Sequence, residues 1–211
     1  MNDIFNQYTE FIICYIDDVL IFSSSIKQHF KHLKIFKQVI IHSGLVISAS
    51  KMKLFQTTVR FLGHNIHNGT IIPINRSIDF ASKFPDKIKD KTQLQRFLGS
   101  LNYIRDFYPK LAQDTALLYA RLKKNPIPWS HQHTLAVKRI KAQIKQLHCL
   151  HLPNPQWSTV ETDASNFGYG GILKQYNPHR QQEELLRFTS GIWKGPSLNY
   201  PTIKKECMYM S

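Results

Sequence analysis

The sequence lacks acidic residues over two long stretches. None of the 14 Asp and Glu residues lies between Val19 and Ile78, and none lies between Thr115 and Val160. Both stretches are rich in lysine and arginine, and the chain of 211 residues carries a formal net charge of +14. Basic residues that neutralise phosphates release counterions, so such an excess favours a polyanionic partner such as nucleic acid. The alternative is a basic surface that serves solubility alone.

Cysteines and long apolar runs are also scarce. Cys14, Cys149 and Cys207 are too few and too widely spaced for a disulfide framework, which favours a reducing compartment. The most apolar run, residues 11–22, is interrupted by two aspartates and is too short to cross a bilayer. The N-terminus shows no basic segment followed by an apolar one. We therefore expect a soluble chain with neither a signal peptide nor a membrane span.

Metal-binding clusters of histidine and cysteine are not evident either. His29 and His32 lie one helical turn apart, and His148, Cys149 and His151 are grouped, but neither set has the paired spacing of a closed zinc site. What the chain does have is an ordinary globular composition, with 42% hydrophobic and 20% charged residues.

Strand and helix patterns alternate irregularly, which predicts a mixed α+β fold. Residues 11–23 form two β-rich runs around Asp17-Asp18. Ser25 and Gln28 then have the spacing of a helix capping box, and Gly44 is expected to end that helix. Asn68-Gly69 is a strong hairpin signal between two strands, of which the first is expected to continue from residue 59 to residue 66. Thr92 and Gln95 predict the start of another helix, and helices are expected to follow until about residue 147. Strand patterns return after the prolines at 153 and 155.

The adjacent carboxylates of Asp17 and Asp18 are the most informative feature. Two acids between apolar strands repel each other and lose solvation unless a cation is present. A divalent metal bound by both would suit phosphoryl transfer. The alternative is an exposed turn, where Asp is common for local reasons.

A second acid, Asp163, lies at the predicted end of a strand and precedes three glycines, Gly168, Gly170 and Gly171. By itself this pattern fits a tight turn as well as a metal site.

The sequences around these acids resemble those of a known family. Tyr15-Ile16-Asp17-Asp18, within FIICYIDDVLIFS, is similar to the palm hairpin of reverse transcriptases, and Phe61-Leu62-Gly63-His64 resembles their primer grip. The segment DKTQLQRFLGSL and the later RLKKNPIPW resemble thumb and connection segments of plant pararetroviruses, the caulimovirus family and its badnavirus-like group. ETDASNFGYGGILKQ resembles the first strands of a retroelement RNase H. The resemblance covers essentially the whole chain.

The resemblance implies an RNA-directed DNA polymerase with RNase H and assigns roles to individual residues. Asp17 and Asp18 would bind the polymerase metal, and Asp163 and Glu206 the nuclease metal; the metal is Mg²⁺, with Mn²⁺ as the alternative. Residues expected to contact nucleic acid or nucleotide are Tyr15, Lys51 or Lys53, Phe61, Leu62, Gly63 and His64.

The family also implies an organisation and partners. We expect a partial palm with the primer-grip hairpin over residues 1–75, thumb and connection helices over 76–152, and the N-terminal half of an RNase H-like fold over 153–211. Expected partners are the RNA/DNA primer–template, deoxynucleoside triphosphates and the rest of a polyprotein. We expect the chain in the cytoplasm or associated with a viral particle.

The family's third polymerase carboxylate and its fingers would precede Met1, and further RNase H strands would follow Ser211. We therefore expect no measurable DNA synthesis or RNA cleavage from the chain alone. It is either a piece of a longer polyprotein or a decayed genomic copy, and the sequence leaves both open. The alternative functions are a non-catalytic, basic nucleic-acid-binding fragment and a structural remnant with vestigial acids.

Overall fold

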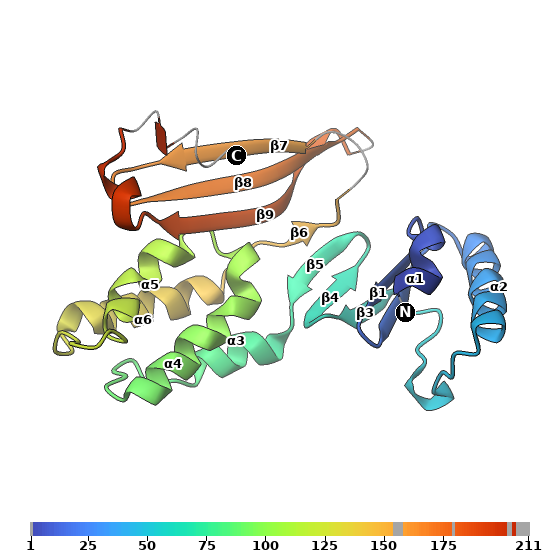
Figure 1. Ribbon diagram of the computed structural model, residues 1–211, viewed down its shortest axis with the longest axis horizontal. Coiled ribbons are helices and arrows are strands. Elements are labelled where there is room, and N and C mark those ends of the chain that lie inside the picture. The colour runs from blue at the N-terminus through green and yellow to red at the C-terminus, as the bar shows by residue number, and fades with distance from the viewer. Residues whose placement is uncertain (1, 154–157, 179, 202–203, 206–211) are drawn as a thin grey trace. The chain divides into compact units, whose positions relative to one another are not determined.

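The computed structural model describes the chain except for residues 1, 154–157, 179, 202–203 and 206–211. The chain divides into two compact units, Met1–Leu62 and Gly63–Ser211 (Figure 1). Both units combine helices with antiparallel sheet, so the mixed α+β class that the sequence predicts is confirmed.

The first unit is a hairpin covered by helices. Its elements are α1 (Asn2–Phe5), the 3₁₀ turn η1 (Asn6–Tyr8), β1 (Ile12–Tyr15), β2 (Asp18–Ile21), α2 (Ile26–Ser43), η2 (Ala49–Lys51) and β3 (Thr58–Phe61). Phe5, Ile12 and Phe36 form its core, and the rings of Phe5 and Phe36 stack with centroids 5.6 Å apart. The hairpin is therefore held to α2 by apolar burial.

Helix α2 begins and ends where its sequence predicts. The Ser25 hydroxyl accepts a hydrogen bond of 3.2 Å from the backbone N–H of Gln28, which satisfies one of the free donors of the first turn. At the other end Gly44 has φ +67°, the left-handed conformation that favours glycine.

The second unit opens with the hairpin β4 (His64–His67) and β5 (Thr70–Pro73). Asn68 and Gly69 join the strands with φ values of +46° and +74°, the pattern of a type I′ turn that their sequence predicts. Strand β5 also pairs with β6 (Leu150–His151), and the N–H of Leu152 donates to the carbonyl of Gly69 at 2.8 Å. The hairpin tip thus holds the chain where it leaves the helices.

Four helices pack into the larger core. They are α3 (Asn75–Ser82), α4 (Lys91–Ser100), α5 (Leu111–Ala120) and α6 (His131–Ile144), with a 3₁₀ segment, η3 (Leu101–Phe107), after α4. Leu94, Phe97, Leu118 and Ile140 are among the fully buried side chains of this core. The start predicted at Thr92 is wrong: Asp90 caps α4 by accepting a 2.7 Å hydrogen bond from the N–H of Gln93.

A three-stranded antiparallel sheet completes the second unit. Its order is β7 (Ser158–Ala164), β8 (Gly168–Asn177) and β9 (Gln182–Ile192), and the 3₁₀ turn η4 (Gly195–Asn199) follows it. Figure 1 shows α5 beneath this sheet, and the N–H of Ala112 donates to the Ser190 hydroxyl at 3.1 Å. Arg187 forms an ion pair of 3.0 Å with Asp106. The sheet is therefore attached to the helices through β9.

Two glycines let β8 and β9 approach closely. A Cβ atom on Gly168 would lie 2.4 Å from the carbonyl oxygen of Gly191, and one on Gly191 would overlap the ring of Tyr169. That ring packs against Trp193, with centroids 4.8 Å apart. Side chains other than hydrogen would force this end of the sheet to shift.

Across the described residues, no helix is both long enough and apolar enough to span a lipid bilayer.

Candidate active sites

The turn between β1 and β2 presents the adjacent carboxylates. Tyr15 and Asp18 are cross-strand partners, so Ile16 and Asp17 form a two-residue turn between them. Asp17 therefore lies in the turn and Asp18 is the first residue of β2; both are exposed. The hairpin that the sequence predicts around the two acids is confirmed.

Ile16 has φ +55°, which is rare for a β-branched residue and costs about 1–3 kcal/mol. Its side chain is 71% exposed, so burial gives little in return. The rest of the hairpin holds Ile16 in this conformation. The conformation in turn fixes the direction of the backbone at Asp17.

The hairpin has a covered face and an open one. Side chains alternate along a strand, and Ile12 and Cys14 belong with Phe36 of α2 in the core cluster. Ile13 and Tyr15 point the other way and are 42% and 52% exposed. Tyr15 and Asp18 thus share the open face. Burial raises the pKa of the Cys14 thiol, which keeps this side chain protonated.

The two lysine candidates follow α2 in the chain. Lys51 ends η2, and Lys53 lies two residues later in extended chain. Both are exposed, and neither forms an ion pair with any residue that the structure describes. Both stay candidates for contact with a nucleotide.

The segment that resembles a primer grip contains a tight turn. Phe61 ends β3, His64 begins β4, and Leu62 and Gly63 between them have φ values of +49° and +80°. The continuous strand predicted over residues 59–66 is therefore wrong, because two consecutive left-handed residues reverse the chain. The division between the two units falls at Leu62 and Gly63. Within the second unit, the ring of His64 lies 5.4 Å from that of Phe107.

Asp163 lies near the end of β7, opposite Gly170 of β8, and is exposed. Glu161 lies on the same face two residues earlier, but it is paired with Lys174 at 2.7 Å. Asp163 forms no ion pair among the described residues, so its carboxylate is available to a cation. Glu206 lies outside the described residues, and its approach to Asp163 stays a prediction.

The turn after Asp163 is fixed by its own hydrogen bonds. The Ser165 hydroxyl accepts from the N–H groups of Phe167 and Gly168, at 3.3 and 3.2 Å. The indole N–H of Trp193 donates to the Ser165 carbonyl at 2.8 Å. A backbone held at both sides keeps the end of β7 in a defined position.

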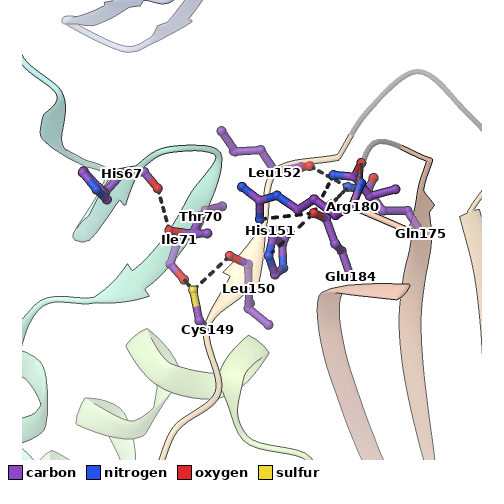
Figure 2. Close-up of polar contacts among 11 residues, drawn as sticks. His67, Thr70, Ile71, Cys149, Leu150, His151, Leu152, Gln175, Arg180 and Glu184 are labelled. Carbon is purple, nitrogen blue, oxygen red and sulfur yellow. Dashed lines mark hydrogen bonds and ion pairs between the residues drawn. The ribbon is translucent and has the colours of Figure 1, made fainter. Parts of the chain in front are cut away.

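A polar junction that the sequence did not predict lies where β6 meets β8 and β9 (Figure 2). Glu184 is its centre and has a side chain only 4% exposed. It accepts hydrogen bonds from Gln175 at 2.9 Å and Asn177 at 2.7 Å, with Arg180 at 3.5 Å and His151 at 3.9 Å. The sequence offered only one local signal for this junction, the four-residue spacing of Arg180 and Glu184. That spacing brings side chains together in a helix and does not predict a contact in paired strands.

Burial acts to raise the pKa of Glu184, but these hydrogen bonds and the nearby His151 and Arg180 outweigh it and lower that pKa. The junction lines a small open hollow of about 190 Å³ beside the Asn68-Gly69 turn. The Cys149 thiol points toward the Ile71 carbonyl at 3.7 Å. Within the described part of the chain, no three or more His, Cys, Asp and Glu side chains gather in a way that would hold a metal.

Two family descriptions match the chain. Residues 1–66 match "Reverse transcriptase (RNA-dependent DNA polymerase)", and residues 129–210 match "RNase H-like domain found in reverse transcriptase". The first match contains the β1–β2 hairpin, and the second contains the sheet that carries Asp163.

Curated relatives are viral polyproteins. The chain is 37% identical over 212 aligned residues to the enzymatic polyprotein of cauliflower mosaic virus (strain D/H), which covers 99% of this chain and 32% of the relative. It is 34% identical over 208 residues to the genome polyprotein of petunia vein clearing virus, covering 99% of this chain and 10% of that polyprotein. The chain therefore spans about a third or less of the length of these relatives.

Solved structures establish the fold independently. The foamy viral protease-reverse transcriptase in complex with an RNA/DNA hybrid matches with a TM-score of 0.81 at 22% identity, over 99% of this chain and 28% of that one. The same type of protein in complex with double-stranded DNA gives a TM-score of 0.78 at 21% identity. The chain thus carries one segment that matches the reverse transcriptase family, at residues 1–66, and one that matches the RNase H-like domain found in reverse transcriptase, at residues 129–210, and nearly its whole length is similar to part of the polyproteins of caulimoviruses.

Proposed function

We propose that this chain supplies part of two metal-dependent sites, one for RNA-directed DNA synthesis and one for RNA cleavage. The observation that carries the proposal is the pair of exposed carboxylates, Asp17 and Asp18, at a strained hairpin turn in a segment of the reverse transcriptase family. The proposed partners are a primer–template, deoxynucleoside triphosphates and the remainder of a polyprotein.

The residues at the hairpin fit a hard divalent cation. Their donors are carboxylate oxygens, which Mg²⁺ prefers, and neither acid is neutralised by a basic side chain among the described residues. A bound divalent cation would neutralise charge that develops on the transferred phosphate. Asp17 and Asp18 would hold it, while Tyr15, on the same open face as Asp18, would contact the nucleic acid or nucleotide.

The nuclease site is proposed at the end of β7. Asp163 is exposed there, free of ion pairs within the described chain, and positioned by the hydrogen-bonded Ser165 turn. Glu206 is its proposed second ligand. Two carboxylates of this kind, with a divalent cation, suit hydrolysis of an RNA phosphodiester.

We propose further that each site takes additional ligands from other parts of a polyprotein, and that the 211 residues alone neither synthesise DNA nor cleave RNA. A two-metal site tolerates the loss of a ligand poorly, because charge and geometry fail together. Robust Mg²⁺-dependent primer extension by the chain alone would contradict this part of the proposal.

The test of the function uses the polyprotein that contains this chain. There Asp17→Asn is expected to abolish DNA synthesis and leave RNA cleavage, whereas Asp163→Asn is expected to do the reverse. Glu10→Gln removes an exposed acid of the first unit without touching either site and serves as the control. If both activities fell together in each variant, the assignment of two separate sites would be wrong.

A further inference from the structure

Helix α2 has an exposed basic face with no acidic residue to balance it. Lys27, Lys31 and Lys34 follow one another at helical spacings of four and three residues, and all three are exposed. None of them forms an ion pair within the described residues. With a rise of about 1.5 Å per residue, they form a stripe about 10 Å long. Three unpaired ammonium groups at this spacing match the charges of a phosphate backbone.

An aromatic pair lies beside the lysines. Phe30 is one turn from both Lys27 and Lys34 on the helix, and its ring lies 5.0 Å from that of Phe55. Both rings stay about half exposed, at 52% and 49%. Exposed neighbouring rings with charged residues around them are typical of a binding surface.

The backbone conformation of Phe55 also indicates a binding surface. Its φ is +55°, an uncommon value for a bulky residue, yet the ring is not buried in return. The conformation instead presents the ring to Phe30 and, edge-on at 5.3 Å, to His29. Strain that yields no core packing points to a function.

We propose that this surface, Lys27, Phe30, Lys31, Lys34 and Phe55, binds single-stranded nucleic acid. Lysines that follow the phosphates and rings that stack on bases are the two parts that sequence-independent single-strand binding requires. The rings favour a single strand over a duplex, because bases within a duplex are already stacked on one another. A duplex would gain only from the lysines.

The surface is separate from the proposed polymerase site. α2 packs Phe36 against the covered face of the hairpin, where Ile12 lies, whereas Tyr15 and Asp18 share the opposite face. A strand lying on the outer side of α2 would not contact these carboxylates. The inference therefore goes beyond the proposed function and fails or succeeds independently of it.

The test is binding of a fluorescently labelled, unstructured RNA of about 12 nucleotides, within the range of known single-strand sites. Anisotropy titrations with the 211-residue chain would be run over a series of salt concentrations. Replacing Lys27, Lys31 and Lys34 by Gln is expected to reduce the steepness of the plot of log affinity against log salt concentration by about 2, because each lost phosphate contact contributes about 0.7. Phe30→Ala and Phe55→Ala are each expected to weaken binding by about 5- to 150-fold, the effect of losing one stacked base.

Matched controls separate this surface from general charge. Lys87, Lys89 and Lys91 are also exposed but alternate with Asp86 and Asp90, so the same triple change to Gln there is expected to have a smaller effect. Phe30→Tyr keeps a ring for stacking and is expected to retain binding. Circular dichroism would confirm that each variant is folded.

Three results would overturn the proposal. One is an equal loss in the two lysine triple variants, which would indicate net charge alone. Another is full binding by folded Phe30→Ala and Phe55→Ala variants. The third is competition by an oligoglutamate peptide as effective as that by unlabelled RNA, which would indicate a protein partner.

Discussion

Asp18 lies directly across the β1–β2 ladder from Tyr15, and the two side chains share the open face of the hairpin. This register follows from a turn of only two residues, Ile16 and Asp17. A turn longer by one residue would move Asp18 out of this pairing, since the side-chain period of a strand is two. The relationship of the acids to the exposed aromatic ring therefore depends on the turn.

We expect the hairpin carboxylates to bind a divalent cation even without catalysis. In the 211-residue chain, Mn²⁺ should broaden the amide NMR signals of residues near the turn, such as Tyr15 and Val19. Asp17→Asn and Asp18→Asn should each weaken this effect, because hard cations need charged oxygen ligands. Glu10→Gln should leave the broadening unchanged. Broadening that persists in the Asp17→Asn, Asp18→Asn double variant would place the cation elsewhere.

Ile16→Gly is expected to stabilise the first unit, by about 0.5–1 kcal/mol, because glycine removes the steric cost of φ +55° and loses little burial. The entropy of the glycine offsets part of the gain. Val46→Gly is the matched control: Val46 is 96% exposed and not in the left-handed region, so this change should destabilise. Urea unfolding measures both. Destabilisation by Ile16→Gly equal to that by Val46→Gly would show that the turn is not strained.

The junction at Glu184 should make the second unit sensitive to acid. The folded state lowers the pKa of Glu184 below its ordinary value of 4.5, so the unfolded chain takes up a proton first as the pH falls. Stability from this group is present above about pH 4.5 and is lost as the pH falls through the folded pKa. Urea midpoints between pH 7 and pH 3 would follow the loss.

Glu184→Gln tests the same junction at neutral pH. It is expected to cost about 1–3 kcal/mol, because Arg180 and His151 lose their charged partner while Gln175 and Asn177 lose an ionic acceptor. The acid sensitivity should flatten in this variant. Glu183→Gln, the exposed neighbour that contacts Lys174, should change both quantities much less. Equal effects in the two variants would indicate a general charge effect.

His133 should produce a separate loss of stability at a higher pH. It is 1% exposed, and burial followed by the charge of Arg121 lowers its pKa. Its Nδ1 accepts a hydrogen bond of 3.0 Å from the N–H of Ser130, an acceptor role that protonation removes. The unfolded chain therefore protonates first, and stability falls as the pH drops below the ordinary value of 6.5.

His133→Gln removes this titration and should flatten the fall in stability between pH 7 and pH 5. His131→Gln, two residues earlier and exposed, should leave the fall intact. An unchanged pH dependence in His133→Gln would assign the effect to another group. One such group is His29, whose pKa is also lowered, by burial and by the charge of His32.

The sequence predicted best what depends on neighbouring residues. The cap at Ser25, the end of α2 at Gly44 and the Asn68-Gly69 turn are local in origin, and the structure has them as predicted. The Asp17-Asp18 turn is local too, which explains why this site was visible.

Competing local signals led to the errors. Asp90 and Thr92 both suit a helix cap, and the aspartate takes that role because the chain enters the helix there. The turn at Leu62-Gly63 was missed because leucine gives no sign of a left-handed conformation. The junction at Glu184 joins side chains from β6, β8 and β9, and no pattern along the chain indicates contacts that only the folded sheet creates.

The close approach at Gly168 and Gly191 bears on the history of this gene. A reading frame that no longer encodes a working protein accumulates substitutions at all positions at similar rates, glycine codons included. Any side chain at Gly168 would collide with the Gly191 carbonyl, so selection for a folded RNase H-like sheet would remove such alleles. Among related copies of this sequence, glycine retained at both positions while exposed positions such as Val160 vary would mark purifying selection. Drift at both glycines would mark a relic.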